Sequence, residues 1–223
     1  MWYQGYMARS LNFLLALSLL VLFAPFIVVI ALLVLVFDGR PVFYYGKRLG
    51  KDGRIFNMLK FRTLSPQAEE KIGGRLMRDN EGLITPFGHL LRCLKLDELP
   101  QLINILKGDM NFVGPRPVRP AMAREYASIV PRYGRRFSIK PGLTGLAQLR
   151  GGYYCPPRRK TRYDLFYIKK KGFLLDFKLF LLTGLRLVIS PACLKTGYMA
   201  NGRPIGKVSQ KQLHERYRMK IMD

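Results

Sequence analysis

The sequence predicts a protein of mixed α and β structure, mostly α-helical, with a small β element and an N-terminal membrane segment. Three observations support this fold class. Residues 10–37 carry no charged side chain and are dominated by Leu, Val, Ile, Phe and Ala. Two short β-prone runs follow, joined by a turn, and apolar residues then recur at helical spacing. A chain of 223 residues suffices for a membrane segment and one compact domain.

The uncharged segment favours a re-entrant helix-break-helix over a helix that crosses the membrane. A straight helix over residues 10–37 would be about 42 Å long, whereas the hydrocarbon layer is about 30 Å thick. Pro25 interrupts the segment near its middle, and each half is too short to cross alone. Arg9 lies before the segment and five basic residues follow it, so both ends prefer the cytoplasmic side. A single tilted span kinked at Pro25 is the alternative.

The chain after the membrane segment begins with an expected two-stranded unit. Residues 38–41 form a turn, and residues 42–45 are β-prone. A hairpin turn at 51–54 then leads into a second strand over 55–62. The polar stretch 67–80 contains two adjacent glycines, which predicts a mobile loop or lid.

The remaining elements are mainly helices. Residues 87–95 and 102–106 have helical apolar patterns, and Lys107-Gly108 ends the second. Residues 121–129 and 173–189 predict amphipathic helices, the latter interfacial or buried. Two proline- or glycine-rich connections are expected, an extended strut at 114–117 and a turn at 141–145. These observations divide the chain into a membrane re-entrant segment at 1–40, a domain on the membrane surface at 41–189 and a basic tail at 190–223, in which 211–222 could form a cationic helix.

The charge of the chain demands an anionic partner. There are 38 Lys and Arg against 14 Asp and Glu, a formal net charge of +24. Nucleic acid, an anionic membrane surface and phosphorylated substrates all fit this excess. The three cysteines and two histidines have no zinc-site spacing, and they suit a reducing cytosolic setting.

An acidic pair, Asp97-Glu98, stands out in this basic chain. It precedes Pro100, a residue suited to the first turn of a helix, so both carboxylates are expected beside free backbone N–H groups. Such a position favours an ionised carboxylate and also attracts phosphate. Taken alone, Asp97 is better explained as an ordinary N-cap, because most Asp residues at helix starts have that role. Adjacent side chains on a helix diverge by about 100°, so both carboxylates reach one phosphate only if the backbone there is not yet regular helix.

Five motifs in a fixed order give a more specific signal. They are Lys60-Phe61-Arg62-Thr63, Leu96-Asp97-Glu98-Leu99-Pro100-Gln101, Leu106-Lys107-Gly108-Asp109-Met110, Val113-Gly114-Pro115-Arg116-Pro117 and Lys140-Pro141-Gly142-Leu143-Thr144-Gly145. Their succession resembles the bacterial sugar transferase family, the monotopic phosphoglycosyl transferases that start polyprenyl-linked glycan assembly. The resemblance covers roughly residues 9–189.

The resemblance implies a two-step transfer. An aspartate attacks the β-phosphorus of a nucleoside-diphosphate sugar, usually a UDP-sugar, and UMP leaves. A polyprenyl phosphate, normally undecaprenyl phosphate, then attacks the acyl-phosphate intermediate and forms a polyprenyl-diphosphate sugar. The family requires Mg²⁺. Its members act at the cytoplasmic face of the bacterial inner membrane, in exopolysaccharide and glycoconjugate biosynthesis.

The resemblance also implies roles for particular residues. Asp97 matches the nucleophile and Glu98 the Mg²⁺-binding carboxylate. The basic positions matched to substrate phosphates are Lys60, Arg62, Arg92 and Arg116. Arg116 is the best candidate to bind the phosphate of the leaving nucleotide, because the prolines on either side make its backbone stiff. Asp164 and Asp176 match acidic family positions and are possible supporting residues, with salt bridges to neighbouring basic residues as the alternative.

The chain departs from the family pattern in places. The family breaks its membrane helix at Ser-Pro, where this chain has Ala24-Pro25, and Asn12 stands where members often carry Asp. The residues 93–95 before the acidic pair are less polar than usual. None of these changes touches the acidic pair.

The predicted partners are a nucleotide-sugar donor, a polyprenyl phosphate acceptor and membrane lipids. A non-catalytic membrane-bound scaffold or lipid-phosphate-binding protein would explain the charge and the apolar segment, but not the ordered motifs. A membrane-tethered nucleic-acid-binding protein would also suit the charge. The chain contains no recognisable nucleic-acid-binding module, so nucleic acid is not an expected partner.

Overall fold

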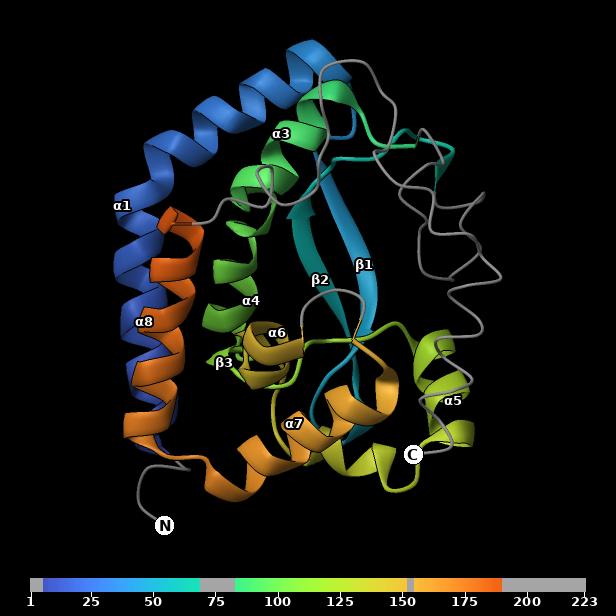
Figure 1. Cartoon of the computed structure of the whole chain (residues 1–223). Coiled ribbons are helices and arrows are strands. Elements are labelled where there is room, and N and C mark those ends of the chain that lie inside the picture. The colour runs from blue at the N-terminus through green and yellow to red at the C-terminus, as the bar shows by residue number, and fades with distance from the viewer. Residues whose placement is uncertain (1–5, 69–82, 152–154, 190–223) are drawn as a thin grey trace.

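The computed structural model describes residues 6–68, 83–151 and 155–189 (Figure 1). In chain order the elements are α1 (Tyr6–Asp38), β1 (Phe43–Leu49), the 3₁₀ turn η2 (Lys51–Gly53), β2 (Ile55–Phe61), α3 (Pro86–Leu94), the 3₁₀ turn η3 (Leu96–Glu98), α4 (Gln101–Lys107), β3 (Asn111–Val113), α5 (Pro120–Ile129), the 3₁₀ helix η4 (Tyr133–Ser138), β4 (Gly142–Thr144), α6 (Leu146–Gly151), α7 (Pro157–Lys170) and α8 (Phe173–Ile189). The loop or lid expected at 67–80 lies almost wholly outside the described residues. So do the basic tail and its expected helix.

The predicted mixed, mostly helical fold with a small β element is confirmed. β1 and β2 form the expected antiparallel hairpin, in which Leu49 pairs with Ile55 across the turn. The turn residues Asp52 and Gly53 have φ angles of 55° and 75°. Asp and Gly tolerate this left-handed region better than most residues, so the turn chemistry explains the register of the hairpin.

The structure corrects the prediction of a turn at 141–145. Residues Gly142–Thr144 are strand β4, which pairs in parallel with β3 to make a second two-stranded sheet. Glycine permits this pairing, because a Cβ atom on Gly142 would lie 2.1 Å from the backbone nitrogen of Gly114. Gly142 and Gly114 therefore allow a close approach between two backbones and do not form a turn.

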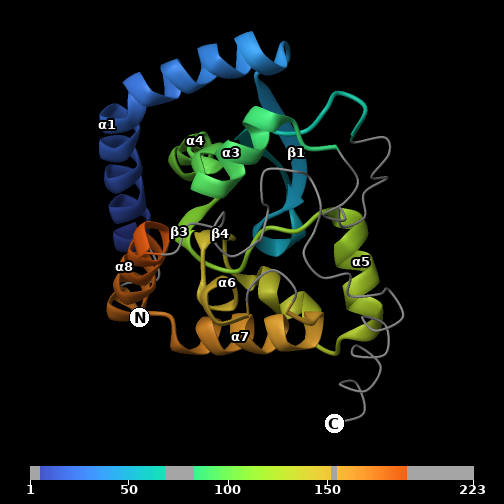
Figure 2. The same cartoon turned by 45° about the horizontal axis from the view of Figure 1, so that its top comes forward.

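Helix α1 runs continuously through Pro25 and bends between two arms (Figures 1 and 2). Ala16 of the first arm packs with Met58, Leu102 and other core residues, and Ile30 of the second packs with Phe61 and Leu91. The helix is long and apolar enough to cross a membrane. Its two arms nevertheless lie against the same domain, and the re-entrant topology stays a prediction.

Both ends of α1 are fastened by arginine side chains. Near the first end, Arg9 donates hydrogen bonds to the carbonyl oxygens of Ile105 (2.6 Å) and Leu106 (2.5 Å), at the C-terminus of α4. Beyond the other end, the buried Arg62 donates to the carbonyl oxygens of Asp38, Gly39 and Arg40. The carbonyl groups that a helix end leaves without partners are thus satisfied by side chains.

Asn12, one of the departures from the family pattern, joins α1 to β3. Its side-chain oxygen accepts from the backbone nitrogen of Phe112 (2.7 Å), and its amide nitrogen donates to the carbonyl oxygen of Ala8 (2.6 Å). A carboxylate could make only the first of these bonds, because it has no donor. The amide therefore suits this buried position.

Helix α8 has the bounds predicted from sequence and lies beside one arm of α1 in both views (Figures 1 and 2). Leu179 is buried in the core, whereas several large apolar side chains of α8 are exposed, among them Phe173, Leu174, Phe177, Leu181 and Leu185. Exposed apolar surface of this kind is typical of a membrane or protein contact. The interfacial position of α8 stays a prediction.

Candidate active site

The acidic pair lies on a short irregular turn between two helices. Helix α3 ends at Leu94, and Lys95 adopts a left-handed conformation with φ of 60°. The chain then makes the 3₁₀ turn η3, which carries Asp97 and Glu98, before α4 begins at Gln101. The backbone at the pair is not yet regular α-helix, which is the condition for both carboxylates to reach one phosphate. A 3₁₀ helix has three residues per turn, so neighbouring side chains diverge by about 120°, compared with about 100° in an α-helix.

Two cations from distant parts of the chain meet the pair. The ammonium nitrogen of Lys60 lies 2.6 Å from Glu98 Oε1 and 3.4 Å from Asp97 Oδ2. A guanidinium nitrogen of Arg116 lies 2.6 Å from the same Glu98 oxygen. Asp97 is 6% exposed as a residue, whereas the Arg116 side chain is 46% exposed. The site is therefore a partly buried carboxylate pair with one cation enclosed and one facing solvent.

These cations set the ionisation of Glu98. Burial alone raises the pKa of a carboxyl group, but Arg116 and Lys60 outweigh burial and hold the pKa of Glu98 well below its ordinary value of 4.5. The carboxylate is thus ionised throughout the neutral pH range. An ionised carboxylate is required of a cation ligand.

Asn104 fixes α4 against β2 and so brings the pair to Lys60. The side chain is 3% exposed, and its oxygen accepts from the backbone nitrogen of Leu59 (2.9 Å). Its amide nitrogen donates to the carbonyl oxygen of Asn57 (2.8 Å). Sequence reasoning missed this residue. The available signal was one amide within the apolar run Leu102-Ile103-Asn104-Ile105, since a buried polar group must find partners.

Residues 114–117 are not helical, as predicted for the strut, and they hold Arg116. The backbone nitrogen of Gly114 donates to Thr144 (2.8 Å), and the carbonyl oxygen of Pro115 accepts from Gly142 (2.9 Å), both on β4. Just beyond the strut, the carbonyl oxygen of Val118 accepts from Leu49 at the end of β1 (3.0 Å). Both sheets thus fix the segment that carries Arg116.

Two of the predicted phosphate-binding arginines contact other protein groups. Arg62 binds the carbonyl groups that follow α1, as described above, and these contacts favour a structural role. Arg92, on α3, donates through Nε to the hydroxyl of Thr63 (2.7 Å), three residues after Lys60. Phosphate binding by Arg62 and Arg92 stays a prediction.

The two supporting aspartates lie in structural pairs. Asp164 forms an ion pair with Arg136 (2.9 Å), and both side chains are buried. Burial raises the pKa of Asp164 from 3.8 to about 6, and the charge of Arg136 opposes this rise only in part. Asp176 accepts a hydrogen bond of 2.6 Å from the hydroxyl of Tyr167. The expected salt bridge is thus present at Asp164, whereas Asp176 is paired with a tyrosine, and a supporting role for either residue stays a prediction.

The carboxylate pair could bind Mg²⁺ only if the substrate supplied some of the remaining ligands. Within the described residues, no three His, Cys, Asp or Glu side chains are grouped to hold a metal. Mg²⁺, however, is commonly held by one or two carboxylates, with water and substrate phosphates in its other positions. In the structure the cation that Glu98 and Asp97 share is the ammonium group of Lys60.

The family model and the individual relatives that match this chain indicate the same family. The bacterial sugar transferase family matches residues 3–190. The chain is 37% identical over 168 residues to the uncharacterized sugar transferase EpsL of Bacillus subtilis, covering 75% of this chain and 80% of that protein. It is 36% identical over 180 residues to a UDP-glucose:undecaprenyl-phosphate glucose-1-phosphate transferase of Caulobacter vibrioides, covering 78% and 67%.

A third relative extends the range of named sugars. The chain is 33% identical over 175 residues to the UDP-N-acetylgalactosamine-undecaprenyl-phosphate N-acetylgalactosaminephosphotransferase of Aeromonas hydrophila. The match covers 77% of this chain but 41% of that longer protein. The family match includes the acidic pair, the strut and α1 through α8, so this chain belongs to the bacterial sugar transferase family.

Proposed function

We propose that this protein transfers a phosphosugar from a nucleoside-diphosphate sugar, in the first place a UDP-sugar, to polyprenyl phosphate. The products are UMP and a polyprenyl-diphosphate sugar, with undecaprenyl phosphate as the natural acceptor. The observation that carries this proposal is the pair Asp97 and Glu98 on one 3₁₀ turn, with Lys60 and Arg116 converging on it. The activities for which the Caulobacter and Aeromonas relatives are named support it.

In the first step, a carboxylate oxygen of Asp97 attacks the β-phosphorus of the donor. The bond between that phosphorus and the bridging oxygen breaks, UMP leaves with the bond's electron pair, and an aspartyl-phosphosugar forms. Lys60, 3.4 Å from Asp97 Oδ2, orients the nucleophile. Arg116 is the more exposed cation and can exchange its contact with Glu98 for the phosphate of the leaving UMP.

In the second step, an oxygen of polyprenyl phosphate attacks the phosphorus of the aspartyl-phosphosugar. The acyl-phosphate bond breaks, the Asp97 carboxylate is regenerated, and the new phosphoanhydride links the sugar phosphate to the lipid. Both steps use the same carboxylate, so the donor and the acceptor must reach it in turn. The exposed apolar residues of α1 and α8 are suited to hold a lipid-linked acceptor beside the domain.

Mg²⁺ is the proposed cofactor, held by Glu98 with Asp97 beside it. When bound, the ion would neutralise charge on the diphosphate of the donor. The low pKa of Glu98 keeps its carboxylate ready for a cation at neutral pH. Lys60 and Arg116 supply further positive charge at the same oxygen.

The proposed setting is the cytoplasmic face of a bacterial inner membrane. One long apolar helix, α1, supports membrane association. The basic excess of the chain suits an anionic membrane surface. UDP-sugars are cytosolic metabolites, so a site that consumes them must open to that side.

The experiment is UMP release from a panel of UDP-sugars, with undecaprenyl phosphate and Mg²⁺. We expect release with at least one sugar, and its complete loss in Asp97→Asn. Asp52→Asn, which changes an exposed carboxylate in the β1–β2 turn, is the matched control and should keep full activity. Lipid binding without UMP release from any donor would favour the scaffold alternative, and full activity of Asp97→Asn would remove Asp97 from the nucleophile role.

A further inference from the structure

A buried ion pair lies behind the strut that carries Arg116. Arg136, on η4, and Asp164, on α7, are 7% and 3% exposed, and their charged groups are 2.9 Å apart. Neither side chain belongs to the acidic pair or to its two cations. Buried ion pairs contribute little net stability as a rule, because desolvation offsets their attraction. This makes the pair a candidate for a role other than stability.

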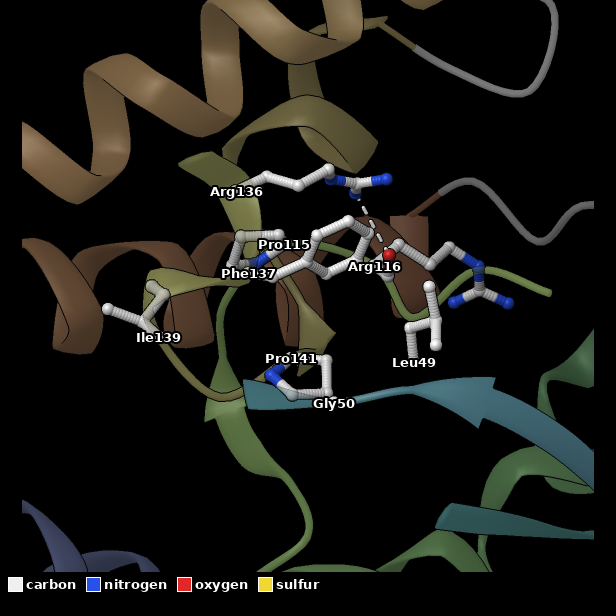
Figure 3. Close-up of a pocket in the computed structure, with 8 residues that line it drawn as sticks. All are labelled: Leu49, Gly50, Pro115, Arg116, Arg136, Phe137, Ile139 and Pro141. Atoms are coloured by element: carbon white, nitrogen blue, oxygen red, sulfur yellow. Dashed lines mark hydrogen bonds between the residues drawn. The ribbon is translucent and has the colours of Figure 1, made fainter. Parts of the chain in front are cut away.

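The Arg136 guanidinium reaches the strut directly. The nitrogen that pairs with Asp164 also donates to the backbone carbonyl oxygen of Arg116 (2.9 Å), a bond drawn as a dashed line in Figure 3. The other terminal nitrogen donates to the hydroxyl of Tyr133 (2.7 Å). The rings of Tyr133 and Phe137 also contact the guanidinium, with centroids 5.1 and 5.8 Å from its carbon. The orientation of the guanidinium is therefore fixed on several sides.

Because the strut is stiff, a hydrogen bond that fixes the backbone carbonyl of Arg116 also restrains the direction of its side chain. Arg116 lies between two prolines, whose rings restrict the backbone on either side of it. The carbonyl oxygen of Arg116 faces Arg136, and its side chain points away from Arg136 (Figure 3) and reaches Glu98 Oε1 at 2.6 Å. A hydrogen bond at the carbonyl therefore limits rotation of the residue that supplies the exposed cation of the site.

We infer that Arg136 and Asp164 are positioning residues that act through the backbone of Arg116 to hold its guanidinium at the phosphate-binding site. Asp164 orients Arg136, Arg136 holds the Arg116 carbonyl, and Arg116 meets Glu98 and the donor phosphate. The inference rests on the proposed function for the part that Arg116 plays. A lysine in place of Arg136 would not reproduce the contacts, because it lacks the planar fork that reaches two acceptors and a hydroxyl together.

The test is a double-mutant cycle in the full-length protein. Arg136→Met with Asp164→Leu replaces the ion pair by apolar side chains, a change that often preserves stability when both charges are removed together. We expect roughly ten- to a hundredfold lower kcat/KM for the UDP-sugar, with an apparent Tm close to that of the wild type. Arg135→Lys, at an exposed neighbour on the same turn, is the matched control and should behave as the wild type.

The cycle distinguishes positioning from a general structural role. In an Arg116→Ala background, the same double change should lower the residual kcat/KM by less than twofold, because the residue through which it acts is gone. An equal loss in both backgrounds would overturn the inference. If the double variant does not fold, Asp164→Asn takes its place, with a smaller loss that must likewise vanish in the Arg116→Ala background.

A second readout separates this inference from the proposed function. If the wild type releases no UMP from any donor, the proposed function fails, and amide hydrogen exchange then decides the positioning role. Exchange in residues 114–119 should be faster in the double variant than in the wild type and in Arg135→Lys. Unchanged exchange in that segment would contradict the positioning of the strut by Arg136.

Discussion

At the scale of single residues, the ionisation of Glu98 depends on Arg116. Burial opposes the charge of Glu98, and the guanidinium of Arg116 is the largest influence that restores it, ahead of Lys60. Because the pKa of Glu98 is lowered in the folded protein, the ionised form persists as the pH falls below the ordinary range of a glutamate. Removal of one cation must move the pKa back upward.

Arg116→Ala should therefore change the pH dependence as well as the rate. We expect kcat/KM to fall on the order of a hundredfold, as when one charge-stabilising donor is removed from an active site. The acid limb of the pH profile should shift to higher pH, because protonation of Glu98 becomes easier. Arg124→Ala, which removes an exposed arginine from α5, is the control. A lower rate with an unmoved acid limb would show that Glu98 does not titrate in the profile.

Sequence reasoning identified the residues of this site but not all of its contacts. The pair Asp97 and Glu98 is adjacent in sequence, and the ordered motifs pointed to Lys60 and Arg116. The contacts of Arg62 with the carbonyl groups after α1, and the pairing of Arg136 with Asp164, depend on long-range packing. No spacing in the sequence specifies such pairs, since an arginine that binds phosphate and one that binds backbone carbonyls look the same in a motif.

At the scale of elements, the position of the acidic pair depends on how α4 is held against β2. The two bonds of Asn104 to Leu59 and Asn57 bridge the elements at a buried position. Met58 and Leu102 belong to the same apolar core cluster beside these bonds. The hydrogen bonds of Asn104 fix the position of α4 along β2, which apolar packing alone would define less well.

Asn104→Ala should lower the free energy of unfolding by about 2 kcal/mol, because the buried backbone N–H of Leu59 and the carbonyl group of Asn57 lose their partner. Activity should fall as well, since Lys60 and the acidic pair lie on the two elements that the bridge joins. The measurement is apparent Tm together with UMP release. Asn57→Ala is the control, because it removes an exposed side chain and keeps the carbonyl group that Asn104 uses. Equal stability of the two variants would contradict this role.

The second sheet shows what pattern reading misses at this scale. Strands β3 and β4 have three residues each, too few for an alternating pattern to emerge. The sequence around Gly142 predicts a turn, although the lack of a side chain at Gly142 permits parallel pairing beside Gly114. By contrast, the β1–β2 hairpin and α8 were predictable, because a turn signal or a long apolar period defined them locally.

At the scale of the whole molecule, α1 wraps one domain with both of its arms. Arg9 ties the first arm to the end of α4, and the carboxylate of Asp38 at the other end accepts a hydrogen bond of 2.8 Å from Thr85, the N-cap of α3. A helix that crossed the bilayer would separate its ends by the membrane thickness. Attachment of both ends to one domain favours the re-entrant topology.

The topology can be measured by labelling single cysteines. In a variant without Cys93, Cys155 and Cys193, we would place cysteine at Met7 or at Arg40, which are both exposed. A membrane-impermeant maleimide should label both positions from the cytoplasmic side only, in inverted vesicles and not in right-side-out ones. Labelling of position 7 and position 40 from opposite sides would establish a spanning helix instead.

The central claim is that Asp97 carries the phosphosugar between donor and acceptor. The most direct measurement is mass spectrometry of the protein after incubation with a UDP-sugar and Mg²⁺, in the absence of polyprenyl phosphate. The account predicts an added mass equal to one phosphosugar, mapped to the peptide that contains Asp97, absent in Asp97→Asn and discharged when polyprenyl phosphate is added. UMP release without such an adduct, or an adduct on another residue, would contradict it.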